Sequence, residues 1–153
     1  MDNQQNTIVS AKAIIQLPDK DGSVLLGRRN GMSKFHPQGW ECLGGKVEVG
    51  EDPNKALLRE IFEESGWNVE EAEITPLRGA PFMNEFYDKG KSILHEVHFS
   101  IVKLGQIMLA NPRVMLSDAH IESRFVKPKE VRNYNLPVTH SKAFKFAFES
   151  GLL

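Results

Sequence analysis

The stretch from Gly44 to Trp67 reads Gly-Gly-Lys-Val-Glu-Val-Gly-Glu-Asp-Pro-Asn-Lys-Ala-Leu-Leu-Arg-Glu-Ile-Phe-Glu-Glu-Ser-Gly-Trp and predicts a glycine-rich loop that leads into a short helix. Asp52 is a favourable N-cap residue, and Pro53 suits the first helical position because its φ angle is already helical. Gly66 can end the helix by adopting a left-handed conformation. The helix would therefore span about three and a half turns, at roughly 3.6 residues per turn.

Three carboxylates would lie on one face of this helix. Glu60, Glu63 and Glu64 are spaced at i, i+3 and i+4, the positions at which helical side chains become neighbours. Like charges at this spacing repel one another and weaken an isolated helix. Carboxylate oxygens are preferred ligands of hard divalent cations, so the acidic stripe indicates a Mg²⁺ or Mn²⁺ site. The alternatives are an ordinary solvated helix face and a structural Ca²⁺ site, although the sequence lacks the alternating Asp/Asn loop of an EF-hand.

The spacing of residues around the acidic stripe resembles the Nudix box, Gly-x5-Glu-x7-Arg-Glu-U-x-Glu-Glu-x-Gly-U, in which U is a bulky apolar residue. The match runs from Gly45 to Trp67 and includes every fixed position. A later segment, Glu122 to Val131, is similar to Glu-x-Arg-aromatic-Val-x-Pro-x-Glu-Val, which lies near the end of many Nudix proteins. The resemblance implies a single Nudix domain over residues 1–153, with the box at 45–67.

The resemblance also implies the fold class, an α/β protein of the Nudix type. In this α/β/α sandwich a mixed β-sheet lies between helices, with the box as a loop-helix-loop on one side, and a C-terminal helix is present. Residue patterns agree with a mixed structure. Apolar runs bounded by turn residues predict strands at 8–17, 24–29, 40–43, 69–76, 80–87, 93–104 and 121–126.

The connections between these strands are predicted from turn and cap residues. The first two strands should form an antiparallel hairpin, because Asp19 to Gly22 is a turn signal. An irregular loop is expected at 105–119, and Pro-Lys-Glu predicts the start of a helix at 128–132. The last helix would be capped by Thr139 or Ser141 and end near Glu149. Its inward residues would be Phe144, Ala147 and Phe148.

The resemblance implies an enzyme, a Nudix pyrophosphohydrolase, that hydrolyses the diphosphate linkage of a nucleoside diphosphate joined to a further group X. A bound Mg²⁺, or alternatively Mn²⁺, would cancel phosphate charge and lower the pKa of a water molecule. By position in the box, the metal ligands would be Glu60, Glu63 and Glu64, with the backbone carbonyl of Gly45.

The remaining box residues would support these ligands. Glu51 would return from the loop to orient the helix carboxylates, and Arg59 would pair with a box carboxylate, of which Glu51 is preferred. The general base stays open between a box residue and three others outside it. These candidates are Glu63, Glu96, Glu122 and His98.

Substrate contacts are predicted at five positions outside the box. Arg28 and Arg29 end a strand and could contact phosphate or serve only as edge charges. Glu96 and His98 interrupt the face of the 93–104 strand and could instead be polar residues on a half-exposed face. His140 occupies the place where some MutT-like enzymes carry an asparagine that reads a purine edge, which leaves that form of base recognition in doubt.

The substrate itself stays open among several nucleotide classes. (Deoxy)nucleoside triphosphates and nucleotide sugars such as ADP-ribose are preferred, and dinucleoside polyphosphates or capped RNA ends are the alternative. A non-catalytic nucleotide-binding module is a further reading, which the complete set of box carboxylates disfavours. The resemblance also allows a homodimer, although no stretch of the sequence marks an interface.

Composition excludes several other classes of function. The formal net charge of the 153 residues is -1, so no basic field favours nucleic acid over a small nucleotide. No apolar run approaches the ~20 residues that span a bilayer, and the polar first residues are unlike a signal peptide. Cys42 is the only cysteine, so no intrachain disulfide can form and a cytoplasmic location is favoured.

Overall fold

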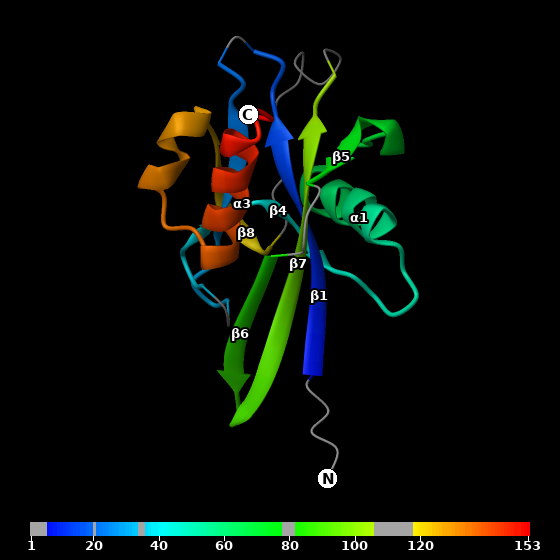
Figure 1. The fold of residues 1–153 in the computed structure, drawn as a ribbon, viewed down its shortest axis with the longest axis vertical. Helices are drawn as coiled ribbons and strands as arrows, with labels where there is room; N and C mark the ends of the chain where they lie inside the picture. Colours follow the sequence, from blue (N-terminus) through cyan, green and yellow to red (C-terminus); the bar gives the residue numbers. More distant parts are fainter. Residues whose placement is uncertain (1–5, 20, 34–35, 78–81, 106–117) are drawn as a thin grey trace.

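The computed structural model describes residues 6–19, 21–33, 36–77, 82–105 and 118–153. Within these ranges a mixed eight-stranded sheet lies between two helical layers (Figure 1). Helix α1, Pro53–Ser65, covers one face, and helix α3, Val138–Glu149, covers the other together with the 3₁₀ helix η2, Pro128–Asn133. This is the expected α/β sandwich with a C-terminal helix.

The long strands β1 and β7 form the centre of the sheet. They run parallel to each other from Asn6 opposite Ile93 to Gln16 opposite Lys103, whereas the other described strand pairs are antiparallel. The strands are β1 Asn6–Gln16, β2 Val24–Arg29, β3 Trp40–Glu41, β4 Leu43–Lys46, β5 Ile74–Pro76, β6 Phe82–Asp88, β7 Lys91–Lys103 and β8 His120–Val126.

Strands β1 and β2 separate soon after the turn that joins them. Their only registered pair in the described residues is Gln16 with Val24, so the predicted hairpin is confirmed at that end alone. Beyond it β1 pairs with β4, and β2 pairs with β3 and β8. The strand predicted at 40–43 is accordingly divided at Cys42 into two short strands. The sheet therefore has an opening between β1 and β2.

The predicted glycine-rich loop is wrong at its first two residues. Gly44 and Gly45 belong to strand β4, where they pair with Lys12 and Ala11 of β1. Gly44 has a φ angle of 138°, and a Cβ atom there would lie 2.0 Å from the carbonyl oxygen of Ala11. A glycine is thus required at this position, because β4 passes too close to β1 for any side chain.

Helix α1 has the predicted ends. The side chain of Asp52 accepts hydrogen bonds from the backbone of Asn54 and Lys55, and Gly66 ends the helix with a φ angle of 76°. Leu57 and Ile61 are fully buried against the sheet. They belong to a core that also contains Ala11, Ala13, Ile15, Leu25, Leu43 and Val102. This packing fixes which face of α1 is turned away from the sheet.

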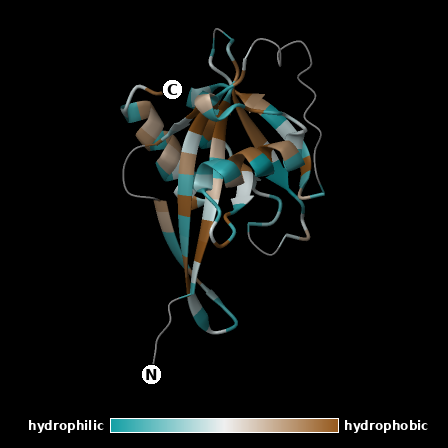
Figure 2. Ribbon diagram, turned by 90° about the vertical axis from the view of Figure 1, so that its right-hand side faces the viewer, coloured by the Kyte–Doolittle hydropathy of each residue, from teal (hydrophilic) through white to brown (hydrophobic). Residues whose placement is uncertain are grey.

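A second core lies on the opposite face, beneath α3. Ala143, Phe144 and Ala147 of α3 pack there with Ile14 of β1 and with Leu26, Val97, Phe99 and Ile101. Successive residues of a strand point to opposite faces, which is why β1 supplies both cores. Figure 2 shows the hydrophobic colour gathered on the strands between the helices.

Several predicted elements differ in detail. The strand predicted at 69–76 is reduced to β5 and preceded by the 3₁₀ helix η1, Glu71–Glu73, and the helix predicted from 128 is the 3₁₀ helix η2. Helix α3 begins at Val138, after Pro137, without a side-chain cap; Thr139 is buried inside its first turn. Phe148 is 39% exposed, so it is not an inward residue.

Apart from 69–76 and the split of 40–43, the strand predictions are confirmed to within two residues at each end, and residues 80 and 81 of the strand predicted at 80–87 lie outside the described ranges. Of the loop expected at 105–119, residues 106–117 lie outside the described ranges. Among the helices that the structure describes, none has the length and apolar character needed to cross a membrane.

Candidate active site

The loop before α1 is tied to the helix by one arginine. Arg59 donates from Nε to Oε2 of Glu51 and from Nη2 to Oε1 of Glu51, and both distances are 3.0 Å. Its Nη2 also donates to the carbonyl of Lys46, 3.2 Å away. The pairing expected between Arg59 and a box carboxylate is therefore present at Glu51. The hydrogen bonds from Arg59 hold the pKa of Glu51 below its usual value.

Glu60 and Glu63 both contact Nη1, the guanidinium nitrogen of Arg59 that does not bind Glu51. This nitrogen lies 3.0 Å from Oε1 of Glu60 and 3.4 Å from Oε2 of Glu63. The Glu60 carboxylate rests against Gly45, where a Cβ atom would come within 2.5 Å of its Cδ. Burial, and next the charge of Glu64, raise the pKa of Glu60. The side chain of Glu63 is 54% exposed and points toward solvent.

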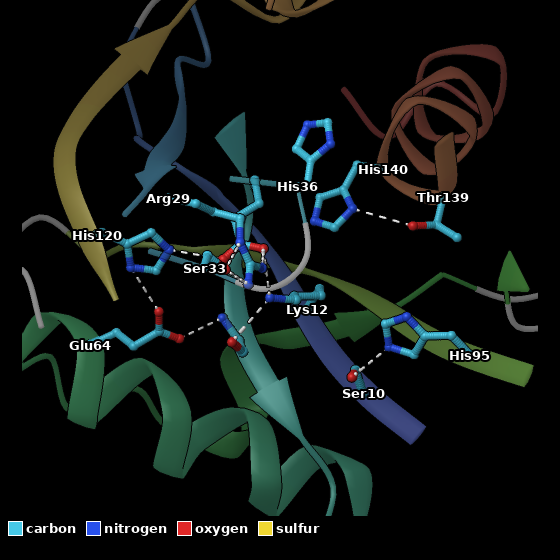
Figure 3. A network of polar contacts seen from close by, with 12 residues as sticks. Ser10, Lys12, Arg29, Ser33, His36, Glu64, His95, His120, Thr139 and His140 are labelled. Carbon is cyan, nitrogen blue, oxygen red and sulfur yellow. Dashed lines mark hydrogen bonds and ion pairs between the residues drawn. The ribbon is translucent and has the colours of Figure 1, made fainter. Parts of the chain in front are cut away.

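The third helix glutamate points into the protein. Glu64 is buried, and its Oε1 accepts a hydrogen bond of 2.9 Å from the backbone N–H of Gly44. Its Oε2 lies 3.1 Å from Nδ1 of His120, an ion-pair distance that falls short of hydrogen-bond geometry (Figure 3). The three carboxylates of the acidic stripe thus face three different environments.

The donor chemistry of this stripe suits a hard divalent cation, since every side-chain donor is a carboxylate oxygen. The missing side chain of Gly45 leaves room for the Glu60 carboxylate beside the backbone. In the ranges that the structure describes, however, His, Cys, Asp and Glu side chains form no group of three already spaced around a metal position.

A buried polar network extends from Glu64 into the opening between β1 and β2. His120 Nε2 lies 3.0 Å from Oε1 of Glu41, while Lys12 Nζ and Arg29 Nη1 lie 3.2 Å and 2.7 Å from Oε2 of Glu41. Lys12 also donates to the carbonyl of Gly44, 3.2 Å away. We name Lys12, Arg29, Glu41, Glu64 and His120 the buried network; Figure 3 labels all of these except Glu41.

Charges in the buried network compensate one another. Burial alone would raise the pKa of Glu41, but Lys12, His120 and Arg29 outweigh it and hold that pKa far below its usual value. Burial alone would lower the pKa of His120, but hydrogen bonding and the charges of Glu41 and Glu64 raise it to about 9. The network therefore contains an ionised Glu41 and a protonated His120 at neutral pH.

The two arginines proposed for substrate contact, Arg28 and Arg29, lie in different environments. Arg29 enters the buried network, where it also meets Ser33. Arg28 donates to the carbonyl of Gln38 and pairs with Glu122 at 3.7 Å. It lines an open cavity of about 760 Å³. Pro37, Gln38, Trp40, Arg124, Glu130, Asn133, Tyr134 and Asn135 complete the lining.

Glu96 and His98 lie on the same face of the sheet as the box. Ala11 is opposite Gly45 on one side and opposite His98 on the other, and paired residues share a face. His98 is therefore two strand spacings from Gly45, or about 10 Å. Its Nε2 is 2.7 Å from Oε1 of Glu96, so the two side chains already satisfy each other.

His140 lies on the α3 face, away from the acidic stripe. The residue is 3% exposed, and its ring packs edge-on against Phe99, with the centroids 5.0 Å apart. Burial, and next the charge of Lys12, lower the pKa of His140 to about 3. Its Nε2 is buried without a hydrogen-bond partner among the described residues. The structure thus separates His140 and Arg28 from the box carboxylates.

The sequence interpretation missed three members of the buried network, Lys12, Glu41 and His120. Lys12 carried a signal, because an ionisable residue inside an apolar strand seldom becomes buried without a partner. Glu41 carried a weaker one, as a charged residue between Trp40 and Cys42. His120 carried none, because its partners come from strands and a helix far away in the chain.

The protein combines a mixed sheet with a carboxylate-bearing helix and the loop that precedes it, and this combination indicates its class. The family model described as the NUDIX domain matches residues 8–146, and the chain belongs to the Nudix hydrolases. It is an enzyme of that class.

Among its relatives is the nucleoside triphosphatase NudI of Escherichia coli O1:K1 / APEC. The two are 30% identical over 143 residues, which cover 93% of this chain and 96% of NudI. A MutT protein from Methanosarcina mazei Go1 has a similar structure, with a TM-score of 0.67, 25% identity, and coverage of 96% and 97%. A MutT/nudix family protein from Enterococcus faecalis matches with a TM-score of 0.74 and 17% identity over 99% of this chain and 64% of that one, which shows the fold alone.

Proposed function

We propose that this Nudix hydrolase cleaves a diphosphate linkage in nucleoside triphosphates, with a divalent cation that is Mg²⁺ or alternatively Mn²⁺. The observation that carries the substrate class is the 30% identity to the nucleoside triphosphatase NudI along nearly the whole length of both chains. The complete box supports hydrolysis rather than mere binding of the nucleotide, because every proposed carboxylate ligand is present.

The cation would be held by Glu60, Glu63 and Glu64 and by the backbone carbonyl of Gly45. When bound, it would supply charge neutralisation on the phosphates and lower the pKa of a water molecule. The buried carboxylate of Glu64 and the Glu60 carboxylate against Gly45 support this assignment. The Glu51–Arg59 pair would keep the loop and helix at a fixed separation during the reaction.

The chemical step needs a base for the attacking water. Water oxygen would form a bond to phosphorus, its proton would pass to a carboxylate, and the P–O bond of the anhydride would break. Glu63 suits this role best because it is the most exposed of the three helix glutamates. Its distance to Arg59, 3.4 Å, is also longer than the 3.0 Å of Glu60. Glu96 is the second candidate, on the same face but already bonded to His98. Glu122 is weaker, because its carboxylate is engaged by Arg28 and Arg124.

Arg28 and His140 stay predicted substrate contacts. Arg28 lines the open cavity, which is large enough for part of a nucleotide. His140 packs against Phe99, which is paired with Lys12 on the neighbouring strand, so it lies on the same side of the sheet as that cation. Arg29 is a less suitable phosphate contact than Arg28, because Glu41 and Ser33 already occupy its guanidinium.

A substrate panel tests this proposal. Purified protein would be incubated with each common ribo- and deoxyribonucleoside triphosphate, ADP-ribose, GDP-mannose and diadenosine polyphosphates, in Mg²⁺, Mn²⁺ or EDTA. We expect nucleoside triphosphates to be hydrolysed fastest and EDTA to abolish turnover. Faster cleavage of ADP-ribose or diadenosine polyphosphates would change the substrate class, and no cleavage of any substrate would refute the hydrolase proposal.

A further inference from the structure

His120 lies where two distant parts of the protein meet. It begins β8 and inserts its ring between the sheet and α1, and its side chain is 1% exposed. Gly27 on β2 makes the space: a Cβ atom there would come within 2.9 Å of His120 Cδ2. The position of the ring is therefore determined by a missing side chain on the neighbouring strand as well as by its own contacts.

One nitrogen of the ring is anchored to a rigid partner. His120 Nε2 meets Oε1 of Glu41 at 3.0 Å. The other oxygen of Glu41 is held by Lys12 from β1 and by Arg29 from β2. Because those two cations come from separate strands, Glu41 has little freedom to rotate and gives His120 a fixed reference in the sheet.

The other nitrogen faces the helix. His120 Nδ1 is 3.1 Å from Oε2 of Glu64, whose Oε1 accepts from the Gly44 backbone. In the described contacts, Glu60 and Glu63 both contact Arg59. Glu64 instead contacts two residues of the sheet, Gly44 on β4 and His120 on β8. The side chain of Glu64 is thus oriented by different groups from those that orient its two neighbours.

We propose that His120 is a positioning residue that fixes the carboxylate of Glu64 for the divalent cation. The role rests on the proposed function, in which Glu64 is a metal ligand. Residues that hold a ligand in place through its second oxygen or nitrogen typically change metal affinity by about 10- to 100-fold when they are lost. His120 never touches the cation or the nucleotide in this role.

A matched pair of substitutions separates positioning from plain stability. The amide nitrogen of asparagine can take the place of histidine Nδ1, and that of glutamine the place of Nε2, because the side chains have corresponding lengths. His120→Asn therefore keeps a donor for Glu64 and loses the one for Glu41. His120→Gln keeps the donor for Glu41 and loses the one for Glu64. Both variants disturb the same buried site.

The readout is the affinity of the nucleotide-free protein for Mn²⁺ alone, measured by electron paramagnetic resonance of free Mn²⁺, beside the melting temperature of each variant. We expect His120→Gln to bind Mn²⁺ about tenfold more weakly than wild type. His120→Asn should stay within about threefold of wild type while showing a comparable fall in melting temperature. The Mg²⁺ concentration for half-maximal hydrolysis should shift in the same order.

A core variant on the opposite face of the sheet from α1 provides the control. Val97→Ala removes a buried side chain beneath α3 and should lower the melting temperature while leaving Mn²⁺ affinity unchanged. Equal Mn²⁺ affinities of the Asn and Gln variants, or a change that follows melting temperature in all three variants, would overturn the positioning role. So would a wild-type protein that binds no Mn²⁺. A wild type that binds Mn²⁺ with the expected order of variants, yet hydrolyses none of the panel, would refute the proposed function alone.

Discussion

Arg59 grips Glu51 with two hydrogen bonds of equal length, from Nε and from Nη2, each 3.0 Å. This two-point contact fixes the orientation of the guanidinium as well as its distance from the loop. The third nitrogen, Nη1, is thereby aimed at Glu60 and Glu63. The pair is thus a joint between the loop and the acidic face of α1.

Replacing Arg59 with lysine should damage this joint without unfolding the protein. Lysine supplies a point charge and cannot form the parallel pair of bonds. We expect Arg59→Lys to lower kcat by at least about tenfold, because a slightly misplaced reacting group is costly in rate. Its melting temperature should change little, since partly exposed ion pairs typically contribute less than about 1 kcal/mol. The control is Lys145→Met, which breaks the exposed pair with Glu149; equal activity of the two variants would contradict the prediction.

The glutamates of α1 should be needed for turnover. Glu63→Gln and Glu64→Gln each keep the shape of the side chain and remove its negative charge. We expect each to lower kcat by orders of magnitude at saturating Mg²⁺, with the circular dichroism spectrum retained. Glu149→Gln at the exposed end of α3 is the matched control and should leave kcat unchanged. Near-wild-type turnover in both box variants would show that this helix face is not the metal site.

The two glycines of β4 should respond differently to alanine. Gly44→Ala should prevent stable folding, because the new Cβ would meet the Ala11 carbonyl oxygen at 2.0 Å in a backbone conformation with positive φ. Gly45→Ala meets a movable Glu60 carboxylate instead, so the fold should survive and kcat should fall by about tenfold or more as that carboxylate is displaced. Thermal melting and steady-state kinetics check both. Gly105→Ala, whose Cβ would have no atom of the described residues within 4 Å, is the control.

Stability should fall in mild acid because of His140. Its pKa is lowered to about 3 in the folded protein from 6.5 in the unfolded chain. The unfolded chain therefore binds the extra proton first, and stability that is complete above pH 6.5 is lost progressively as the pH falls toward 3. One such group corresponds to about 2 kcal/mol at pH 5. His95, whose pKa is also lowered by burial and Lys12, acts in the same direction.

Urea unfolding of wild type and His140→Asn at pH 7.5 and pH 5 isolates this contribution. Asparagine does not titrate, so the variant should lose less stability than wild type between the two pH values, although it is less stable at pH 7.5. Glu41 contributes mainly below pH 4.5, outside this window, and His120, whose raised pKa adds stability as the pH falls from about 9 to 6.5, does so equally in both proteins. Parallel losses in the two proteins would show that His140 is not buried in its neutral form.

Residues close together in the chain allowed the box to be predicted from the sequence. The ends of α1 depend on Asp52, Pro53 and Gly66, all within the same short segment, and each behaves as its chemistry requires. The Arg59–Glu51 contact is expected from the resemblance to the Nudix box, whose residues also lie within this short segment. Local chemistry therefore defined the helix and its acidic face without knowledge of the sheet.

The strand pairing and the buried network depend on contacts between residues far apart in the chain. The sequence holds no direct signal for these contacts. The separation of β1 from β2 and the division at Cys42 depend on which strands find each other. Only that pairing brings Lys12 to Glu41 and opens the space in which both are buried. The 3₁₀ helices η1 and η2 likewise replace predicted regular elements; η2 buries Val131, whereas η1 buries none of its three residues.

The reach of the buried network has a consequence for the order of folding. Glu41 and His120 are 79 positions apart in the chain, and β1 joins β7 in parallel across most of the sequence. Contacts between such remote residues form slowly, whereas a capped helix can form within microseconds. During synthesis α1 is complete long before β8 leaves the ribosome. A nascent chain thus carries the residues of its acidic helix early, but Glu64 meets His120 only in the last stages of assembly.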